Sequence, residues 1–229
     1  MLSLKSLCAL RLGRCLSNVA SKNLEGQRLM VVGLGNYIMA GTRHSIGMAV
    51  VNQLARRLNI SDRWKADKKT GADLTDTDID GMHIVLMKPR QFMNLNGKSV
   101  ANAVIHLFPI ATKFQLKPEN IYLLHDELDK PLGKVSLKFG GSDRGHKGVR
   151  SCITSLQSNI MTRLLVGIGR PADRSSVEWH VLGRFTKAEQ DLLPDILERS
   201  VDLVLSHIKQ NTGSEPSRKP ATSQDPIKS

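Results

Sequence analysis

The residue best suited to chemistry in this sequence is a loop histidine, His44, in the turn GTRHSIG. A carboxylate from elsewhere in the chain could hold it. A histidine held by a carboxylate can take a proton from water, because the carboxylate fixes its tautomer and stabilises the imidazolium. Asn36 and Asn94 could supply amide donors to a developing oxyanion or to a substrate carbonyl. Together these groups would suffice for ester cleavage by water, although a loop histidine can equally be without a catalytic role.

Short apolar runs that alternate with helical patterns would position these side chains. Such alternation predicts a single α/β domain with a mostly parallel sheet covered by helices on both faces. The last predicted helix contains Pro194, near which we expect a bend. By their hydrophobic patterns, strands are predicted at 28–35, 83–89, 120–128, 134–141 and 163–169, and helices at 46–58, 98–108, 146–156 and 186–208.

Polar side chains follow three of these strands at the point where each strand ends. Asn36 follows the first strand, Met93 and Asn94 follow the next, and His125 and Asp126 end the one after that. In α/β sheets, ligands bind beyond the carboxyl ends of the strands. We therefore expect these side chains to share one site.

The segment VVGLGNYI matches a dinucleotide-binding turn only in part. The fingerprint G-x-G-x-x-G requires a third glycine, and Ile38 occupies that position. The following helix is predicted to begin near residue 45, whereas a phosphate-binding turn opens directly into its helix. We therefore expect no nucleotide cofactor.

The segment HDELD, residues 125–129, could instead bind a metal through one imidazole and three carboxylates. Neighbouring residues of a strand face opposite sides, so His125 and Asp126 should diverge. The sequence contains no HExxH or CxxC motif, and we expect no metal. It also has no G-x-S-x-G motif for a serine nucleophile. Cys152 lies in the apolar helical segment SCITSL and is predicted to be a buried structural residue.

Length and charge narrow the class of protein. A chain of 229 residues suits one domain with extensions, and 40% hydrophobic residues suffice for a core. The net charge of +12 favours a polyanionic partner, nucleic acid first, but does not separate RNA from DNA or an anionic membrane surface. Three cysteines without metal-type spacing suit a reducing compartment. No segment approaches the roughly 20 apolar residues of a membrane span.

The two ends differ in composition from the domain expected at 27–210. Residues 1–26 carry Lys5, Arg11, Arg14 and Lys22 among leucines at helical spacing, with no acid before residue 25. This pattern is typical of a mitochondrial transit peptide, the alternative being a disordered basic arm. Without those four charges, 29 basic residues still oppose 21 acidic ones, a net charge of +8. Residues 211–229, rich in Ser, Pro and Lys, are predicted to be disordered.

The chain is similar, from about residue 28 to about residue 208, to bacterial-type peptidyl-tRNA hydrolases, and above all to the animal member of that family. It contains, in the order found there, GLGN, TRHSIG, FMNLNGKSV, HDELDKPLGKVSLKFGGSDRGHKGVRS, RLLVGIGRP and HVLGRF. The resemblance implies a monomeric domain with a twisted mixed sheet. It also implies hydrolysis of the ester between peptide and tRNA, which recycles tRNA from aborted translation without metal or cofactor.

The resemblance assigns roles to three residues of the catalytic centre. His44 would be the general base that activates water. Asp126 would hold His44 and stabilise its catalytic form. Asn36 would recognise the acylated amino group, which separates peptidyl-tRNA from free aminoacyl-tRNA.

The resemblance also implies substrate contacts. Phe92 and Asn94 would line the site for the tRNA end, with Met93 packed beside them. Lys147 and Met39 stand at two further positions tied to substrate binding. The basic body fits a tRNA substrate, since phosphate contacts position a nucleic acid without reading its sequence. Phosphate contacts are predicted for Lys138, Arg150 and Arg170, whose alternative is ordinary solvated surface.

Five positions depart from the family pattern. Tyr37-Ile38 replaces Pro-Gly, and Met39 stands where an aromatic residue is usual. Lys147 replaces an asparagine, and an ammonium only donates hydrogen bonds where an amide also accepts them. Leu165 removes one arginine.

Two rival functions remain at this stage. The first is non-catalytic RNA binding on the same fold, which Lys147 and Leu165 favour and the intact His44–Asp126 pair opposes. The second is hydrolysis of small neutral esters, which gain nothing from a basic surface. The expected location is mitochondrial, or cytoplasmic if residues 1–26 are not a transit peptide.

Overall fold

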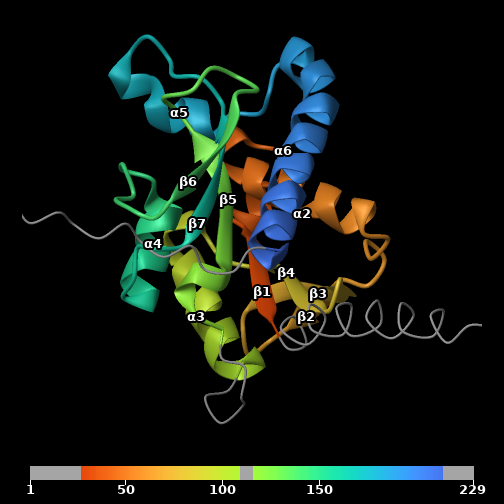
Figure 1. Cartoon of the computed structure of the whole chain (residues 1–229). Coiled ribbons are helices and arrows are strands. Elements are labelled where there is room, and N and C mark those ends of the chain that lie inside the picture. The colour runs from red at the N-terminus through yellow and green to blue at the C-terminus, as the bar shows by residue number, and fades with distance from the viewer. Residues whose placement is uncertain (1–26, 109–115, 214–229) are drawn as a thin grey trace, which may run out of the picture.

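The computed structural model describes residues 27–108 and 116–213 as a seven-stranded mixed sheet between two layers of helices (Figure 1). The predicted arm at 1–26 and most of the predicted tail at 211–229 lie outside the described residues. The strands are β1 (Arg28–Gly33), β2 (Lys65–Asp67), β3 (Ala72–Ile79), β4 (Met82–Pro89), β5 (Ile121–Glu127), β6 (Val135–Phe139) and β7 (Thr162–Gly167). The helices are α2 (Ile46–Arg57), α3 (Asn96–Leu107), α4 (Lys147–Leu156), α5 (Val177–Leu182) and α6 (Lys187–Gly213).

The sheet combines a parallel centre with antiparallel edges. Its strand order is β2-β3-β4-β1-β5-β7-β6. β1 pairs in parallel with β4 and β5, and β5 pairs in parallel with β7. β2, β3 and β6 run antiparallel to their neighbours. The expected single α/β domain with a mixed sheet is confirmed, and the four central strands end at one edge.

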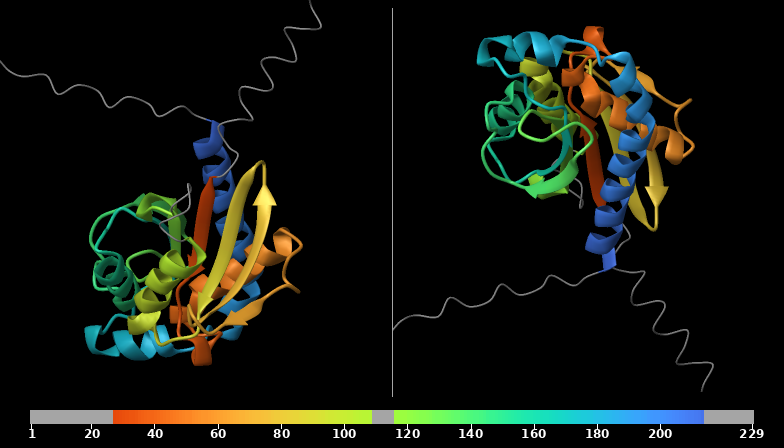
Figure 2. Two further views of the ribbon diagram at one scale, coloured as in Figure 1. Left: turned by 90° about the horizontal axis from the view of Figure 1, so that it is seen from below. Right: turned by 90° about the horizontal axis from the view of Figure 1, so that it is seen from above.

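Helices cover both faces of the sheet (Figure 2), and alternate residues of β1 enter two separate cores. Leu29 and Val31 pack under α2 and α6, while Met30 and Val32 pack under α3 and α4. Such a strand is apolar throughout because both of its faces are covered. Cys152 is fully buried in the second core, as predicted, and burial raises the pKa of its thiol to about 12.

The sequence patterns missed β2 and β3. β3 reads ADLTDTDI, and its polar residues hide the period of two. It pairs along its whole length with β4, from Ala72 opposite Pro89 to Ile79 opposite Met82. The strand lies near the edge of the sheet, where one face can remain exposed to water.

The last helix is longer than predicted and passes through Pro194 as one element. Proline removes one backbone hydrogen bond, but Ile196, Val201 and Val204 are buried in the core and hold the chain there. The helix continues to Gly213, so residues 211–213 belong to it rather than to the tail. Asn211 Nδ2 lies 3.3 Å from His207 Nε2, one turn earlier.

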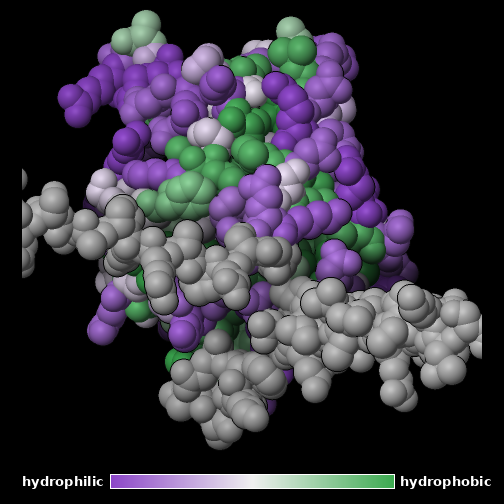
Figure 3. All heavy atoms as spheres, viewed as in Figure 1, coloured by the Kyte–Doolittle hydropathy of each residue, from purple (hydrophilic) through white to green (hydrophobic). Residues whose placement is uncertain are grey.

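The surface is largely hydrophilic along α6 and around α5, and a hydrophobic area lies over β6 (Figure 3). Phe139, at the end of β6, is 66% exposed. Within the ranges that the structure describes, we find no helix with the length and apolarity needed to cross a membrane.

Gly47 lets α2 approach β5 closely, three residues after His44. A Cβ atom at this position would lie 2.0 Å from the carbonyl oxygen of Leu124, which directly precedes His125 and Asp126. The backbone of Leu34 reaches the same carbonyl, with its nitrogen 2.9 Å away. Glycine is therefore required here for the helix that follows His44 to reach the strand that carries Asp126.

Replacing Gly47 with alanine is expected to destabilise the fold by about 1–3 kcal/mol or more, because the added methyl group overlaps backbone that cannot move aside. The same displacement would separate His44 from Asp126 and lower activity. Urea unfolding measures the first effect. Arg56→Ala, on the exposed side of the same helix, serves as the control and should change the free energy of unfolding by less than about 0.5 kcal/mol. Equal stabilities of the two variants would contradict the prediction.

Candidate active site

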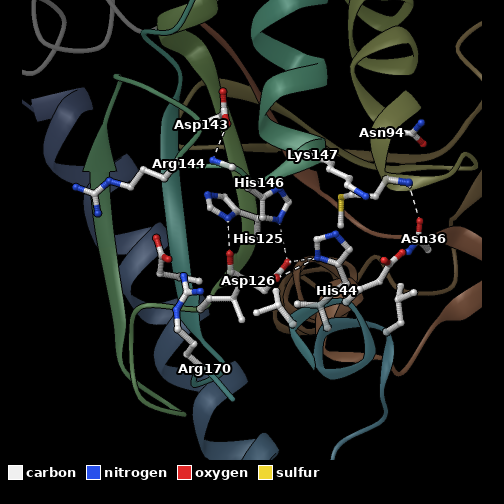
Figure 4. A pocket seen from close by; sticks show the side chains of 18 of the residues that line it. Asn36, His44, Asn94, His125, Asp126, Asp143, Arg144, His146, Lys147 and Arg170 are labelled. Atoms are coloured by element: carbon white, nitrogen blue, oxygen red, sulfur yellow. Dashed lines mark hydrogen bonds and ion pairs between the residues drawn. The ribbon is translucent and has the colours of Figure 1, made fainter. Parts of the chain in front are cut away.

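A cavity of about 730 Å³ opens beyond the carboxyl ends of β1, β4 and β5 (Figure 4). The polar residues at the strand ends predicted a site at this edge of the sheet. In the figure, His44 and Asp126 lie near the centre, with Asn36 and Asn94 to one side and Arg170 to the other. The strand ends contribute Asn36, Phe92, Met93, Asn94, His125 and Asp126, and the walls come mainly from residues 143–147 and 174–182.

His44 and Asp126 form the pair that the resemblance implied, although 82 residues separate them. The Nδ1 atom of His44 lies 2.9 and 3.0 Å from the two carboxylate oxygens. An ionised carboxylate only accepts hydrogen bonds, so Nδ1 carries the proton and Nε2 keeps its lone pair. His44 lines the cavity, and both side chains are buried. The arrangement is that of a general base held by a carboxylate.

Asp126 remains ionised although it is completely enclosed. Burial alone raises the pKa of a carboxyl group, but His146 and His44 oppose that effect. The electrostatic interaction of the carboxylate with these two rings, together with the hydrogen bonds that the rings donate, holds the pKa of Asp126 well below its usual range.

His146 is a site residue that the sequence reasoning missed. Its Nδ1 accepts hydrogen bonds from the backbone nitrogens of Gly148 and Val149, each at 3.2 Å, and so caps α4. The proton must then be on Nε2, which donates to Asp126 Oδ1 at 2.9 Å. The available signal was a histidine next to a glycine at the predicted start of a helix, but histidine is not a usual capping residue.

Arg163, also missed, fixes the loop that leads to His146. Its side chain is buried, and its guanidinium donates to the backbone carbonyls of Gly141 and Ser142, the latter at 2.6 Å. Burial lowers its pKa from the ordinary arginine value. Leu165, where an arginine was expected from the family pattern, is buried in β7 opposite His125.

The atoms of His44, Asp126 and His146 lie within 4.8 Å of one another, close enough for a metal site. The hydrogen bonds disfavour one. Nδ1 of His146 already accepts from two backbone groups, and a metal on Nε2 would displace the proton given to Asp126. The absence of a metal remains a prediction, which this pattern supports.

The segment HDELD does not assemble as a metal site. His125 Nδ1 donates to the backbone carbonyl of Asp126 at 2.6 Å rather than joining the carboxylate. Glu127 accepts from the backbone of Asp129, and Asp129 pairs with Arg170 at 2.7 Å. Of these five residues, Asp126 alone belongs to the three-residue cluster.

His125 stays neutral beside these charges. It is 3% exposed, and burial, followed by the nearby His146, lowers its pKa from 6.5 to about 3. Its ring centroid lies 4.5 Å from that of His146. Because the His125 ring is neutral and bonded to the backbone, His44 and His146 are the side chains that donate hydrogen bonds to the Asp126 carboxylate.

The depressed pKa of His125 predicts a loss of stability in acid. The unfolded chain binds a proton below about pH 6.5 and the folded chain only near pH 3, so this contribution is complete above pH 6.5 and falls as the pH drops. The slope reaches about 1.4 kcal/mol per pH unit for one proton. Urea unfolding from pH 7 to 4 should therefore show a shallower decline for His125→Asn than for the wild type. If the free energy of unfolding fell equally with pH in the variant and in the wild type, the predicted contribution of His125 would be refuted.

Asn36 presents its amide NH₂ group to the cavity. Its Oδ1 accepts from the backbone nitrogen of Met93 at 2.6 Å, which leaves Nδ2 as the free donor. Its own backbone nitrogen donates to Ser45 Oγ at 3.1 Å. Asn96, which the sequence reasoning missed, ties the same two loops together through Gly35 and Phe92.

The remaining substrate-binding candidates differ in position. Phe92, Asn94 and Lys147 line the cavity and are exposed. Met93 is buried against Gly148 and forms part of the cavity wall. Met39 is not among the lining residues, and its carbonyl instead accepts from Thr42 and Ser45.

The three predicted phosphate contacts do not form one cluster at the cavity. Arg170 lines it and pairs with Asp129. Arg150 pairs with Asp143 at 3.2 Å on the exposed surface. Lys138 Nζ lies 3.4 Å from the carbonyl of Ser142. All three remain on the surface, and their role stays a prediction.

Fold and site together describe an α/β domain equipped for general-base catalysis. The chain matches the family described as peptidyl-tRNA hydrolase over residues 30–225. A probable peptidyl-tRNA hydrolase of Mus musculus is 52% identical over 191 residues, which cover 83% of this chain and 90% of the mouse protein. The enzyme of Nocardia farcinica is 40% identical over 177 residues, covering 76% and 87%.

Solved structures agree. The crystal structure of peptidyl-tRNA hydrolase from Acinetobacter baumannii matches with a TM-score of 0.64 at 33% identity, covering 86% of this chain and 98% of the other. A complex of peptidyl-tRNA hydrolase with n-propanol gives a TM-score of 0.66 at 34% identity, covering 84% and 96%. This chain belongs to the peptidyl-tRNA hydrolase family. Its activity is accordingly the hydrolysis of peptidyl-tRNA.

Proposed function

We propose that His44 is the general base of this hydrolysis and that Asp126 holds it in the required tautomer. The observation that carries the proposal is the contact of His44 Nδ1 with both oxygens of the buried Asp126, inside the cavity. Nε2 is then free to bind the attacking water. General-base assistance of this kind contributes about 10²–10⁴-fold to a rate.

The steps follow from these positions. The oxygen of water attacks the ester carbonyl carbon while one of its protons passes to His44 Nε2, and Asp126 stabilises the imidazolium. Collapse of the tetrahedral intermediate breaks the bond to the ribose 3′ oxygen. His44 returns the proton to that oxygen, which gives tRNA with a free 3′ hydroxyl. The peptide leaves as a carboxylic acid, which loses its remaining proton to the solvent.

The cavity walls suit the two parts of the substrate. The free amide donor of Asn36 can bind the carbonyl of an acylated amino group, which aminoacyl-tRNA lacks. Asn94 and Lys147 can add donors to the oxyanion. The exposed ring of Phe92 can stack on the terminal base of the tRNA, since every base offers a face for stacking.

Single-turnover hydrolysis of an N-acetylated aminoacyl-tRNA tests this proposal. The protein is first treated with a chelator and then dialysed, so that the tRNA keeps its Mg²⁺ in the assay. We expect full activity and little cleavage of the free aminoacyl-tRNA. Loss of activity that Zn²⁺ or Mn²⁺ restores would overturn the metal-free mechanism. Tight tRNA binding without any hydrolysis would favour the RNA-binding alternative.

We also propose that Lys138, Arg150 and Arg170 contact tRNA phosphates. Phosphate contacts release counterions, so binding should weaken steeply as salt rises. Each substitution to alanine should lower the slope of log K against log salt by about 0.7–0.9. Lys65→Ala, on β2 at the opposite edge of the sheet, is the control. A slope unchanged by all three substitutions would remove these residues from the interface.

A mitochondrial location and a monomeric state complete the proposal. Residues 1–26 are basic and contain one acid, Glu25. Fused to a fluorescent protein, they should direct it to mitochondria, whereas a cytosolic distribution would support the alternative. Light scattering should give a mass near 25.3 kDa for the full chain, or correspondingly less if a leader is removed.

A further inference from the structure

Tyr37, which directly follows Asn36, contacts residues of two other segments of the chain. Its hydroxyl donates to Asp73 Oδ2 at 2.8 Å. The Arg90 guanidinium lies over its ring, 5.0 Å from the centroid, and reaches Asp73 Oδ1 at 3.4 Å. We call Tyr37, Asp73 and Arg90 the Tyr37 anchor. It joins the loop after β1 to β3 and to the residue that follows β4.

Burial, a protonated hydroxyl and a backbone hydrogen bond all stabilise the Tyr37 anchor. The side chain of Asp73 is 13% exposed, so its charge is screened less than that of a surface carboxylate. The hydrogen bond to Asp73, together with burial, raises the pKa of Tyr37, so the hydroxyl stays protonated and donates. The backbone nitrogen of Tyr37 also donates to the Gln91 carbonyl at 3.2 Å.

The two loops joined by the anchor are the ones that orient Asn36. Asn36 directly precedes Tyr37, and its carbonyl accepts from Met39 at 2.9 Å. Its Oδ1 accepts from Met93, two residues after Gln91. A shift between these loops would therefore change the direction in which the Asn36 amide donates. His44 is held by a separate contact, with Asp126 on β5.

We propose that Tyr37 is a positioning residue that sets the orientation of the Asn36 amide and thereby the selection of the acylated substrate. The inference rests on the proposed function of Asn36.

The test compares Tyr37→Phe, Asp73→Ala and the double variant in single-turnover hydrolysis. For Tyr37→Phe we expect kcat/KM on N-acetylated aminoacyl-tRNA to fall roughly tenfold, as for the loss of one hydrogen bond to a charged group. The preference over free aminoacyl-tRNA should fall as well, while the pH profile keeps its shape. The double variant should be no worse than the more impaired single variant, because both changes break one contact.

Two measurements separate positioning from a general loss of structure. The ¹⁵N signal of the Asn36 side-chain amide should shift in Tyr37→Phe. It should stay in place in the control Asp78→Asn, which removes the charge from an exposed contact between β3 and His83 of β4. An unchanged amide signal with unchanged selectivity would overturn the inference. If the wild type failed to cleave peptidyl-tRNA, the proposed function would fail, while the amide signal would still decide whether Tyr37 positions Asn36.

Discussion

His44→Ala is expected to lower the single-turnover rate of peptidyl-tRNA hydrolysis by about 10²–10⁴-fold, with tRNA affinity nearly unchanged. The reason is that Nδ1 of His44 is occupied by Asp126, so that Nε2 is the group free to take a proton from water in the cavity. Binding energy from the tRNA comes from other parts of the surface and should survive. Quenched-flow hydrolysis and filter binding measure the two quantities separately.

A matched control is His83→Ala. His83 lies on β4 and pairs with the exposed Asp78, away from the residues that line the cavity. It should retain the wild-type rate. If His44→Ala kept more than about a tenth of the wild-type rate, the general base would have to be another group, and His44 would be an ordinary buried histidine.

Asp126→Asn is expected to lower the rate by about 10³–10⁴-fold, a loss like that seen when the carboxylate of a catalytic triad becomes an amide. Asp126 Oδ1 accepts from both His44 and His146 at 2.9 Å. If the amide oxygen keeps this shared place, its NH₂ group faces Nδ1 of His44 and forces the proton to Nε2. The imidazole then has no lone pair to offer to water.

The same substitution should change the response to acid. Because the pKa of Asp126 is depressed in the folded protein, its carboxylate adds stability above its ordinary pKa of about 3.9, and this is lost as the pH falls below that value. Asp126→Asn lacks the contribution at every pH. Denaturant unfolding at pH 7 and pH 3 should therefore show a larger wild-type advantage at pH 7. Asp76→Asn, on the exposed side of β3, is the control for both assays. An Asp126→Asn variant that stays folded and keeps the wild-type rate would refute the role assigned to Asp126.

The sequence alone determined the architecture where burial was complete. β1, β4, β5 and β7 were predicted because strands covered on both faces read as continuous apolar runs. β3 was missed because this strand next to the edge of the sheet reads ADLTDTDI, in which exposed acids at positions 76 and 78 hide the period of two. The boundaries of α6 also differed, since core packing at Ile196 and Val201 outweighs the local effect of Pro194.

The candidate site was predictable as a set of positions but not as a set of contacts. Asn36, Asn94 and Asp126 follow strand ends, and the parallel centre of the sheet brings such residues to one edge. The role of His44 beside Asp126 came from the resemblance to a family, because no local spacing relates two residues this far apart. Their contact depends on Gly47, where the absence of a side chain lets α2 touch β5.

Tertiary structure alone decided the hydrogen bonds that set charges and orientations. His146 became part of the site because its Nδ1 caps α4 and directs Nε2–H to Asp126. Tyr37 was recognisable only as a departure from Pro-Gly until the fold placed Asp73 and Arg90 around it. Hydrophobic periodicity reports which face of an element is buried. It carries no information about which polar atoms form hydrogen bonds between elements. At this site those hydrogen bonds determine which atoms carry the protons.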